Sequence, residues 1–458
     1  MTSTRELIEA TFGLQAADFD AATVRSTRQL LLDHVGVAAN GSRTDSAVVF
    51  RKSMGRLSAG GQALLPVIGA HQQAPALQAA MANALASHAI EYDDVHNGSS
   101  LHPGVVIYPV AMAAAALVGA TDEAILRGIV VGYEVMCRVG RAANPPSHYA
   151  RHFHPTGTVG TIGAAAAAAA VMGLNVDQAV SAVGIAASMA SGSMQFLVDG
   201  AWTKRLHPAL AARNGIEAAF LAADGYTGTL DGVSGARGFL AAYSNEPHPE
   251  VLLEDWGSRP LEIVATSVKA HTCCRYNQGG IDAVLALRRE HSLTPADIAE
   301  VTVGVPTVAV DIVLEPQDEK RRPQSVVAAQ FSLCFGVAAA LRFGRAGLDE
   351  YVQDTLFDPV MTQLMDRVSY EVDPAIDAVY PNEWRAWVRV RTVDGRVLTH
   401  SVREPKGDPG NPLTDSELEA KFRSLTDTIF VPDVQDRVVS IVSRFGEPGT
   451  FEALRGSI

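Results

Sequence analysis

One short stretch of the chain gathers acids and histidines where the apolar spacing predicts the end of a buried helix. It runs from residue 88 to residue 104, and its acidic and basic side chains are those of His88, Glu91, Asp93, Asp94, His96 and His102. Small apolar residues dominate both flanks, at 76–86 and 105–120, which predicts that the neighbouring helices are buried. Because burial shifts the pKa values of acids and bases, we interpret this stretch as part of a functional site rather than as a solvated helix end.

A second polar stretch, residues 147–157, precedes a helix predicted to begin at Thr158. Backbone N–H groups at a helix N-terminus bind anions, and Arg151 and the Thr158 hydroxyl would add to such a site. His152 and His154 stand two residues apart in the same stretch. They would suit a metal ion if the backbone were extended and the paired aspartates of the first stretch joined them, so a metal site is an alternative interpretation.

Residues 200–208 form a third stretch, in which Lys204, Arg205 and His207 precede a helix expected to begin at Pro208. A lysine in this position can neutralise a carboxylate, or it can serve as a base near neutral pH if it is desolvated. A solvated cationic turn is the structural alternative.

A fourth stretch, residues 269–278, lies where the predicted helices give way to a mixture of helices and strands. Clefts often form at such domain junctions. Its adjacent cysteines, Cys273 and Cys274, are poor disulfide partners for each other, so packing is their expected role. Ser332 lacks a Gly-x-Ser-x-Gly motif, and the chain has no phosphate-binding or dinucleotide-binding glycine motif.

The composition excludes several classes of protein. The formal net charge of −13 argues against a nucleic-acid or anionic-membrane partner. The alanine-rich runs are too weakly hydrophobic for membrane spans, and the four cysteines lack the spacing of a zinc or iron–sulfur site. Residues 1–19 do not have the pattern of a signal peptide, so we expect a cytoplasmic protein with reduced thiols.

The hydrophobic spacing predicts a mostly α fold in which an all-α first half precedes a mixed second half. The helices predicted in the first half are 21–39, 76–90, 109–119, 122–142, 158–172, 176–194 and 208–223. In the second half we expect a strand at 298–313 and helices at 325–343 and 359–368. Residues 384–402 should form two strands joined at Asp394–Gly395. Thr414, with Glu417 three residues later, has the capping-box pattern of a helix start.

At 458 residues the chain exceeds the usual size of one hydrophobic core, so we expect two domains. The larger one is a discontinuous all-α helical domain of residues 1–266 plus 403–458, on which the tail helices dock. The smaller one is an inserted α+β domain of residues 267–402.

The four stretches, in this order, resemble those of the MmgE/PrpD family, which includes 2-methylcitrate dehydratase, cis-aconitate decarboxylase and iminodisuccinate epimerase. The resemblance spans nearly the whole chain and rests on residues 88–96, 101–104, 153–160, 203–208, 269–274, 329–332 and 410–415. It implies a homodimer, an inserted domain that closes over a metal-free cleft, and no cofactor.

The resemblance also implies roles for single residues. The histidines of the family's site fall on His102 and His154, its lysine on Lys204, and its acidic helix end on Glu91, with the two aspartates beside it. Tyr149 lies close to the position of a tyrosine thought to be catalytic in the epimerase. The chain departs from the family at Gln278 and the Asn before it. Decarboxylases and many dehydratases carry a threonine followed by a histidine at these two positions. This departure disfavours decarboxylation.

We therefore predict a cofactor-independent lyase that removes a proton next to a carboxylate of a small di- or tricarboxylic acid and eliminates water. Return of the proton to the opposite face would instead make the enzyme an epimerase or isomerase. A metal-binding protein and a non-catalytic dimer are alternatives from other classes. The predicted catalytic residues are His102, His154, Lys204, Asp93 and Tyr149. The predicted substrate-binding residues are Glu91, Asp94, Arg151, Thr158, Arg205, His207, Lys269, Cys274 and Gln278.

Overall fold

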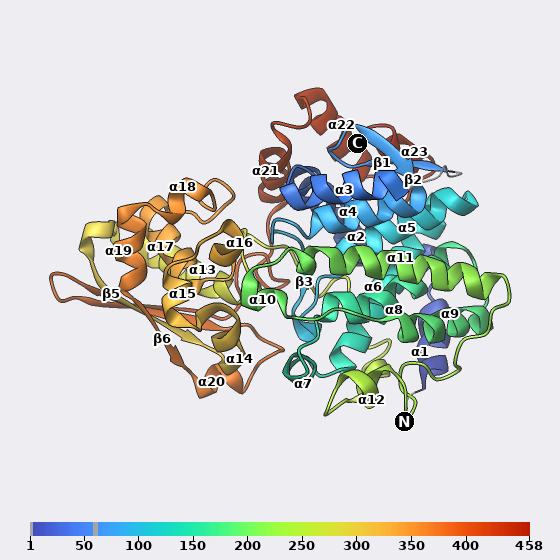
Figure 1. The fold of residues 1–458 in the computed structure, drawn as a ribbon, viewed down its shortest axis with the longest axis horizontal. Helices are drawn as coiled ribbons and strands as arrows, with labels where there is room; N and C mark the ends of the chain where they lie inside the picture. Colours follow the sequence, from blue (N-terminus) through green and yellow to red (C-terminus); the bar gives the residue numbers. More distant parts are fainter. Residues whose placement is uncertain (1–2, 58–62) are drawn as a thin grey trace. The chain divides into compact units, whose positions relative to one another are not determined.

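The computed structural model describes residues 3–57 and 63–458. The remaining residues, which the predicted helical domain includes, lie outside the described part of the chain. The contacts divide the chain into two compact units (Figure 1). The helical unit comprises Met1–Phe196, Ala201–Thr266 and Thr414–Ile458, and the mixed unit comprises Leu197–Gly200 and Ser267–Leu413.

The helical unit confirms the prediction of a mostly α fold. Among its described residues, no helix combines the length and the apolar character that crossing a bilayer requires. Its helices are α1 (Thr4–Phe12), α2 (Ala21–Gly41), α3 (Asp45–Leu57), α4 (Ala76–Ser87), α5 (Gly104–Val118), α6 (Asp122–Ala142), α7 (Pro145–Ala150), α8 (Pro155–Val171), α9 (Val176–Met189), α11 (Thr203–Ala223), α12 (Phe239–Tyr243), α21 (Asp415–Thr426), α22 (Pro432–Val442) and α23 (Thr450–Arg455).

Helix α8 is the centre of the helical unit. All its residues are buried, and it packs against both α6 and α11. Small residues allow these backbones to approach closely: a Cβ atom added to Gly215 of α11 would lie 2.3 Å from the Cβ atom of Ala164, and one added to Gly163 would lie 2.5 Å from that of Met136. The alanine and glycine content of the first half therefore builds a tightly packed helical core.

This packing predicts that alanine substitution at two helical glycines has different effects on stability. Replacing Gly215 by Ala should lower the free energy of unfolding by about 1–3 kcal/mol or more, because the added methyl group has no space. Replacing Gly55 of α3 by Ala should leave stability unchanged or raise it by up to about 1 kcal/mol, because nothing lies within 4 Å of the added atom and Ala favours a helix. Denaturant titration of both variants measures the difference. Equal effects at the two positions would contradict the close packing of α8 and α11.

The mixed unit is built on a four-stranded sheet with the order β6-β5-β7-β8. Strand β5 pairs parallel with β6 and antiparallel with β7, and β7 and β8 form an antiparallel hairpin. Buried aliphatic residues such as Ile281 of α13, Val303 of β5 and Val337 of α17 form its core. Its elements are α13 (Arg275–His291), β5 (Ile298–Val305), α14 (Thr307–Ala309), α15 (Gln317–Arg321), α16 (Val326–Gln330), α17 (Leu333–Phe343), α18 (Gln353–Leu356), α19 (Pro359–Asp366), β6 (Val368–Val372), α20 (Pro374–Asp377), β7 (Ala386–Thr392) and β8 (Val397–Val402).

Several predicted elements were wrong in extent. The single helix predicted at 325–343 is two helices, α16 and α17, because Ser332 accepts the N–H of Phe335 and caps a new helix. The strand predicted at 298–313 ends before Pro306, which cannot donate a ladder hydrogen bond. The first half is not purely helical, since β1 (Leu64–Val67) and β2 (Gln72–Pro75) form an antiparallel pair. Short elements also lie at β3 (Val95–His96), α10 (Phe196–Asp199) and β4 (Thr266–Ser267).

The predicted start of the helix at Pro208 was wrong as well, and this correction affects the third polar stretch. Helix α11 begins at Thr203, and Pro208 lies inside it. Lys204, Arg205 and His207 therefore lie on the first turns of a rigid helix rather than in a preceding turn.

Candidate active site

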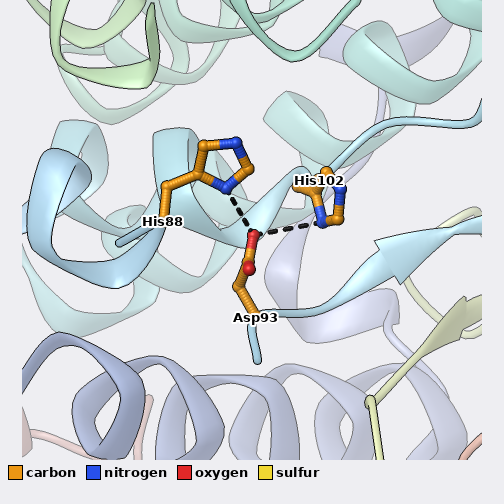
Figure 2. Close-up of side chains that lie close together, drawn as sticks. All are labelled: His88, Asp93 and His102. Carbon is orange, nitrogen blue, oxygen red and sulfur yellow. Dashed lines mark hydrogen bonds and ion pairs between the residues drawn. The ribbon is translucent and has the colours of Figure 1, made fainter. Parts of the chain in front are cut away.

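Two histidines of the first stretch converge on one carboxylate oxygen (Figure 2). His88 is the residue that ends α4, and its Nδ1 atom lies 2.7 Å from Oδ2 of Asp93. The Nδ1 atom of His102 lies 3.1 Å from the same oxygen and 2.6 Å from the backbone carbonyl oxygen of Asp94. Ionised carboxylates and carbonyls only accept hydrogen bonds, so Nδ1 carries the proton in both rings. The lone pair of each neutral ring is consequently on Nε2, where it can accept a proton.

Asp94 is buried, and its hydrogen bonds hold the loop that carries His102. Its carboxylate accepts the N–H of Gly104 at 3.0 and 3.1 Å and the hydroxyl of Tyr133 at 2.7 Å. Burial raises the pKa of Asp94 to about 8, against the opposing effect of the Tyr133 hydrogen bond, so the group is mostly protonated at neutral pH. Gly104 is required at this point, because a Cβ atom there would lie 2.8 Å from Oδ2 of Asp94. Asp94 thus fixes the start of α5 and the loop that carries His102.

The raised pKa of Asp94 has a consequence for stability. Between its ordinary pKa of 3.8 and the folded value of about 8, the folded chain binds a proton that the unfolded chain has released. The free energy of unfolding should therefore fall with rising pH by on the order of 1 kcal/mol per pH unit from this group. Asp94→Asn keeps an acceptor for Gly104 and Tyr133 but cannot ionise, so its stability should fall less steeply in denaturant titrations from pH 5 to pH 8. Parallel curves for the two proteins would contradict the assignment.

A second pair of histidines adjoins the first. His154 precedes the first residue of α8, and its Nδ1 atom lies 3.0 Å from Nδ1 of His207 on α11. The ring of His154 stacks on that of His88, with centroids 5.6 Å apart. It also makes an edge-to-face contact with the ring of Phe196, with centroids 5.9 Å apart. In the Nδ1–Nδ1 contact one ring donates and the other accepts, which couples the protonation of the two histidines.

These buried histidines are neutral at physiological pH. Burial lowers the pKa of His88 to about 4 and that of His207 to about 4, and it lowers the pKa of His154 well below the ordinary value. The neighbouring Lys204 ammonium lowers all three further. A neutral imidazole can take up a proton, whereas an imidazolium cannot.

Lys204 supplies the positive charge of the cluster. It lies in the first turn of α11, is buried, and forms an ion pair with Glu91, whose backbone has a φ of 55°. The next residue, Arg205, donates to the hydroxyl of Ser46 at 2.9 Å. A left-handed backbone at a glutamate is uncommon and is maintained only where the surroundings enforce it. The pair therefore holds an ammonium group beside the histidines, where a substrate carboxylate can bind it.

The tail of the chain supports the turn that carries Glu91. Lys421 of α21 lies 2.6 Å from a carboxylate oxygen of Asp33 on α2 and donates to the backbone carbonyl of Tyr92 at 2.9 Å. Its ammonium group also lies 3.9 Å from the centroid of the Tyr92 ring. Sequence reasoning missed this contact, and a lysine within an amphipathic helix gives no signal for it. His88 was also left out of the predicted site residues, although it belongs to the same stretch as His102.

Other residues predicted for the site make their hydrogen bonds elsewhere. Arg151 is exposed and donates to the side chain of Asn245 at 3.0 Å. The Thr158 hydroxyl is buried, 2.9 Å from Nε2 of His148, and it donates to the backbone carbonyl of His154. The predicted anion site of these two side chains is therefore not formed in this structure. Tyr149 donates to the backbone carbonyl of Ser100, in the loop before His102.

Three predicted residues belong to the mixed unit and are described within it. Lys269 and Cys274 are buried there. The Gln278 amide bonds with the backbone of the preceding loop: it accepts the N–H of His271 and donates to the carbonyls of His271 and Cys273. Gln278 thus organises a loop.

The metal alternative named at the sequence level was wrong in its residues. His152 is exposed and has a φ of 60°. Among the described residues, the group of at least three His, Cys, Asp or Glu side chains that could surround one ion is instead His88, Asp93 and His102, whose donor atoms lie within 4.8 Å of one another. The same three side chains form the hydrogen-bonded group described above, in which both Nδ1 atoms face oxygen.

Comparison with known proteins covers almost the whole chain. Residues 5–252 match the model of the MmgE/PrpD N-terminal domain, and residues 271–446 match that of the MmgE/PrpD C-terminal domain. The cis-aconitate decarboxylase-like protein oryM of Aspergillus oryzae is 29% identical over 96% of this chain and 93% of its own length. The cis-aconitate decarboxylase of Mus musculus is 26% identical over 94% of this chain and 88% of its own length, and that of Homo sapiens is 26% identical over 96% and 91%. The chain therefore belongs to the MmgE/PrpD family, and it is an enzyme of the lyase class.

Proposed function

We propose that the enzyme removes a proton from the carbon next to a carboxylate of a small tricarboxylic acid and eliminates water from the neighbouring carbon. The observation that carries this proposal is the placement of His102 and His154 in one buried cluster with Lys204. A hydrogen next to a carboxylate is only weakly acidic. Its removal needs a positioned base and a cation that faces the charge developing on the carboxylate.

The environments of the two histidines differ in a way that assigns their roles. Burial and the neighbouring Lys204 ammonium lower the pKa of His154 and favour its neutral form, so we assign it the role of the base. His102 is held by oxygen atoms, with Nδ1 lying 3.1 Å from Oδ2 of Asp93 and 2.6 Å from the carbonyl oxygen of Asp94, and we assign it the role of the acid.

The proposed step balances in protons and electrons. His154 takes the proton, and the electron pair of the broken C–H bond becomes the second bond of the new C=C. The C–O bond of the neighbouring carbon breaks, and the departing hydroxide takes the proton of His102 and leaves as water. Lys204 binds the substrate carboxylate whose charge increases in the transition state.

Decarboxylation is a second candidate, favoured by the names of the relatives in Aspergillus oryzae, Mus musculus and Homo sapiens. One observation favours water elimination over it. Gln278 occupies the position where the family resemblance implies a histidine in decarboxylases, and its amide is used by the backbone of His271 and Cys273. An amide such as that of Gln278 has no titratable proton to donate.

The products distinguish these reactions. Purified enzyme is incubated separately with 2-methylcitrate, citrate, cis-aconitate and iminodisuccinate, and the mixtures are followed by proton NMR. We expect an alkene with the carbon number of the substrate from one of the two hydroxy acids. A product one carbon shorter would establish decarboxylation, and a change of stereochemistry alone would establish epimerisation. No reaction with any of them would contradict the proposal.

Removal of metal ions should leave turnover unchanged. The proton on Nδ1 of His88 and of His102 faces oxygen, so the triad is complete without a cation. The measurement is kcat after dialysis against a chelator, with the metal content determined in parallel. Loss of activity on dialysis, with recovery on addition of one divalent ion per chain, would contradict a metal-free mechanism.

We also propose that the enzyme is a homodimer, as the family resemblance implies. Light scattering should then give twice the 48.4 kDa mass of one chain. A mass of one chain at working concentration would contradict this proposal.

A further inference from the structure

His88 lies against both histidines to which the proposed reaction assigns a proton transfer, and it also bonds to Asp93. Its Nδ1 atom lies 2.7 Å from Oδ2 of Asp93, and its ring centroid lies 5.0 Å from that of His102 (Figure 2). The centroid of the His154 ring lies 5.6 Å from that of His88. The side chain is fully buried, so it has no access to a substrate in this structure. Any effect of His88 on the reaction must act through these neighbours.

Packing alone does not explain an imidazole at this position. In the described part of the chain, Nε2 of His88 has no hydrogen-bond partner, and the atom has no contact with solvent. A buried polar atom without a partner costs about 1–3 kcal/mol. A phenyl ring would fill similar space without this cost, so the feature that distinguishes histidine here is the Nδ1–H group that donates to Asp93.

That hydrogen bond fixes one oxygen between two rings. Oδ2 of Asp93 accepts from His88 at 2.7 Å and lies 3.1 Å from Nδ1 of His102. Nδ1 of His102 in turn lies closer, at 2.6 Å, to the carbonyl oxygen of Asp94. The shorter bond to His88 thus fixes the carboxylate in contact with His102, and His102 keeps its bond to the backbone and its ring orientation.

We propose that His88 is a positioning residue of the active site, which holds the Asp93 carboxylate between itself and His102 and separates the ring of His102 from that of His154. This inference rests on the proposed function of the two histidines. Loss of the Nδ1 donor allows Asp93 and the ring of His102 to move. Misplacement of a reacting group by about 1 Å can reduce the rate of the chemical step by about 100-fold.

Two substitutions separate the donor from the ring. His88→Phe keeps a ring but removes the donor, and kcat should fall by about 100-fold with little change in KM. His88→Asn places an amide near the position of Nδ1, where it can donate to Asp93, and it should retain most of the wild-type kcat. The matched control is Tyr243→Phe, which likewise keeps a ring and removes a donor, because the Tyr243 hydroxyl donates to the backbone carbonyl of Ala190 at 2.7 Å and is outside the proposed machinery. It should retain wild-type kcat.

Crystal structures of the wild type and of His88→Phe give a readout that does not depend on turnover. We expect the 3.1 Å separation of Asp93 Oδ2 and His102 Nδ1 to change by more than about 0.5 Å in the variant. An unchanged separation, a wild-type kcat in His88→Phe, or equal losses in the Phe and Asn variants would overturn the inference. An inactive wild-type enzyme would instead contradict the proposed function, and the two structures would still decide the role of His88.

Discussion

His154→Asn should reduce kcat by about 10²–10⁴-fold, the range that removal of a general base produces. The substituted amide can still reach His207 in place of Nδ1, but it has no counterpart of Nε2 to take up a proton. Substrate affinity should change little, because His154 does not supply the charge that binds the carboxylate. Steady-state kinetics with calorimetric binding of the substrate measure both effects. Wild-type kcat in this variant would contradict the role of His154 as the base.

Lys204→Met should reduce kcat/KM by about 10²–10³-fold, because it removes the cation beside the histidines. It also leaves the buried Glu91 carboxylate without its ammonium partner, which should lower the free energy of unfolding by about 3–5 kcal/mol. The double variant Lys204→Met/Glu91→Gln removes both charges and separates the two effects. It should recover most of the lost stability and none of the lost activity.

The double variant shows whether Lys204 acts on the substrate or is needed only for folding. If the double variant recovers kcat/KM together with stability, the lysine is needed only for folding and does not bind substrate. Thermal denaturation and kinetics on the same preparations distinguish these results.

Elements that depend on local sequence were predictable. Helix α6 has the predicted bounds, the hairpin turns at Asp394–Gly395 as expected, and Thr414 forms the predicted capping box with Glu417. Each of these features is determined by residues a few positions apart, through helical spacing, turn conformation or side-chain capping.

Contacts between distant residues could not be predicted in the same way. The bond between His154 and His207 joins positions 53 residues apart, and the bond from Lys421 to Tyr92 spans 329 residues. Such pairings depend on how the helices pack, so composition and residue spacing do not predict them. The resemblance placed His102, His154 and Lys204 in one site as a set, but it gave no geometry and implied no role for His88.

Arg151 shows a different limit of sequence reasoning. A cation within three residues of His154 is an obvious partner for an anionic substrate. Arg151, however, directly follows α7, and its side chain donates to the exposed Asn245. The direction in which a side chain leaves the end of a short helix is determined by tertiary contacts, so its neighbours in sequence do not predict its partner.

Hydrogen exchange at carbon tests the division of labour between His154 and His102 most directly. The substrate identified by the product assay is incubated in deuterated water with the wild type, His154→Asn or His102→Asn, and deuterium at the carbon next to the carboxylate is followed by NMR. This assignment of roles predicts that His102→Asn forms product slowly but still exchanges this hydrogen, because its base is intact, whereas His154→Asn does neither. Exchange that persists in His154→Asn and disappears in His102→Asn would contradict it.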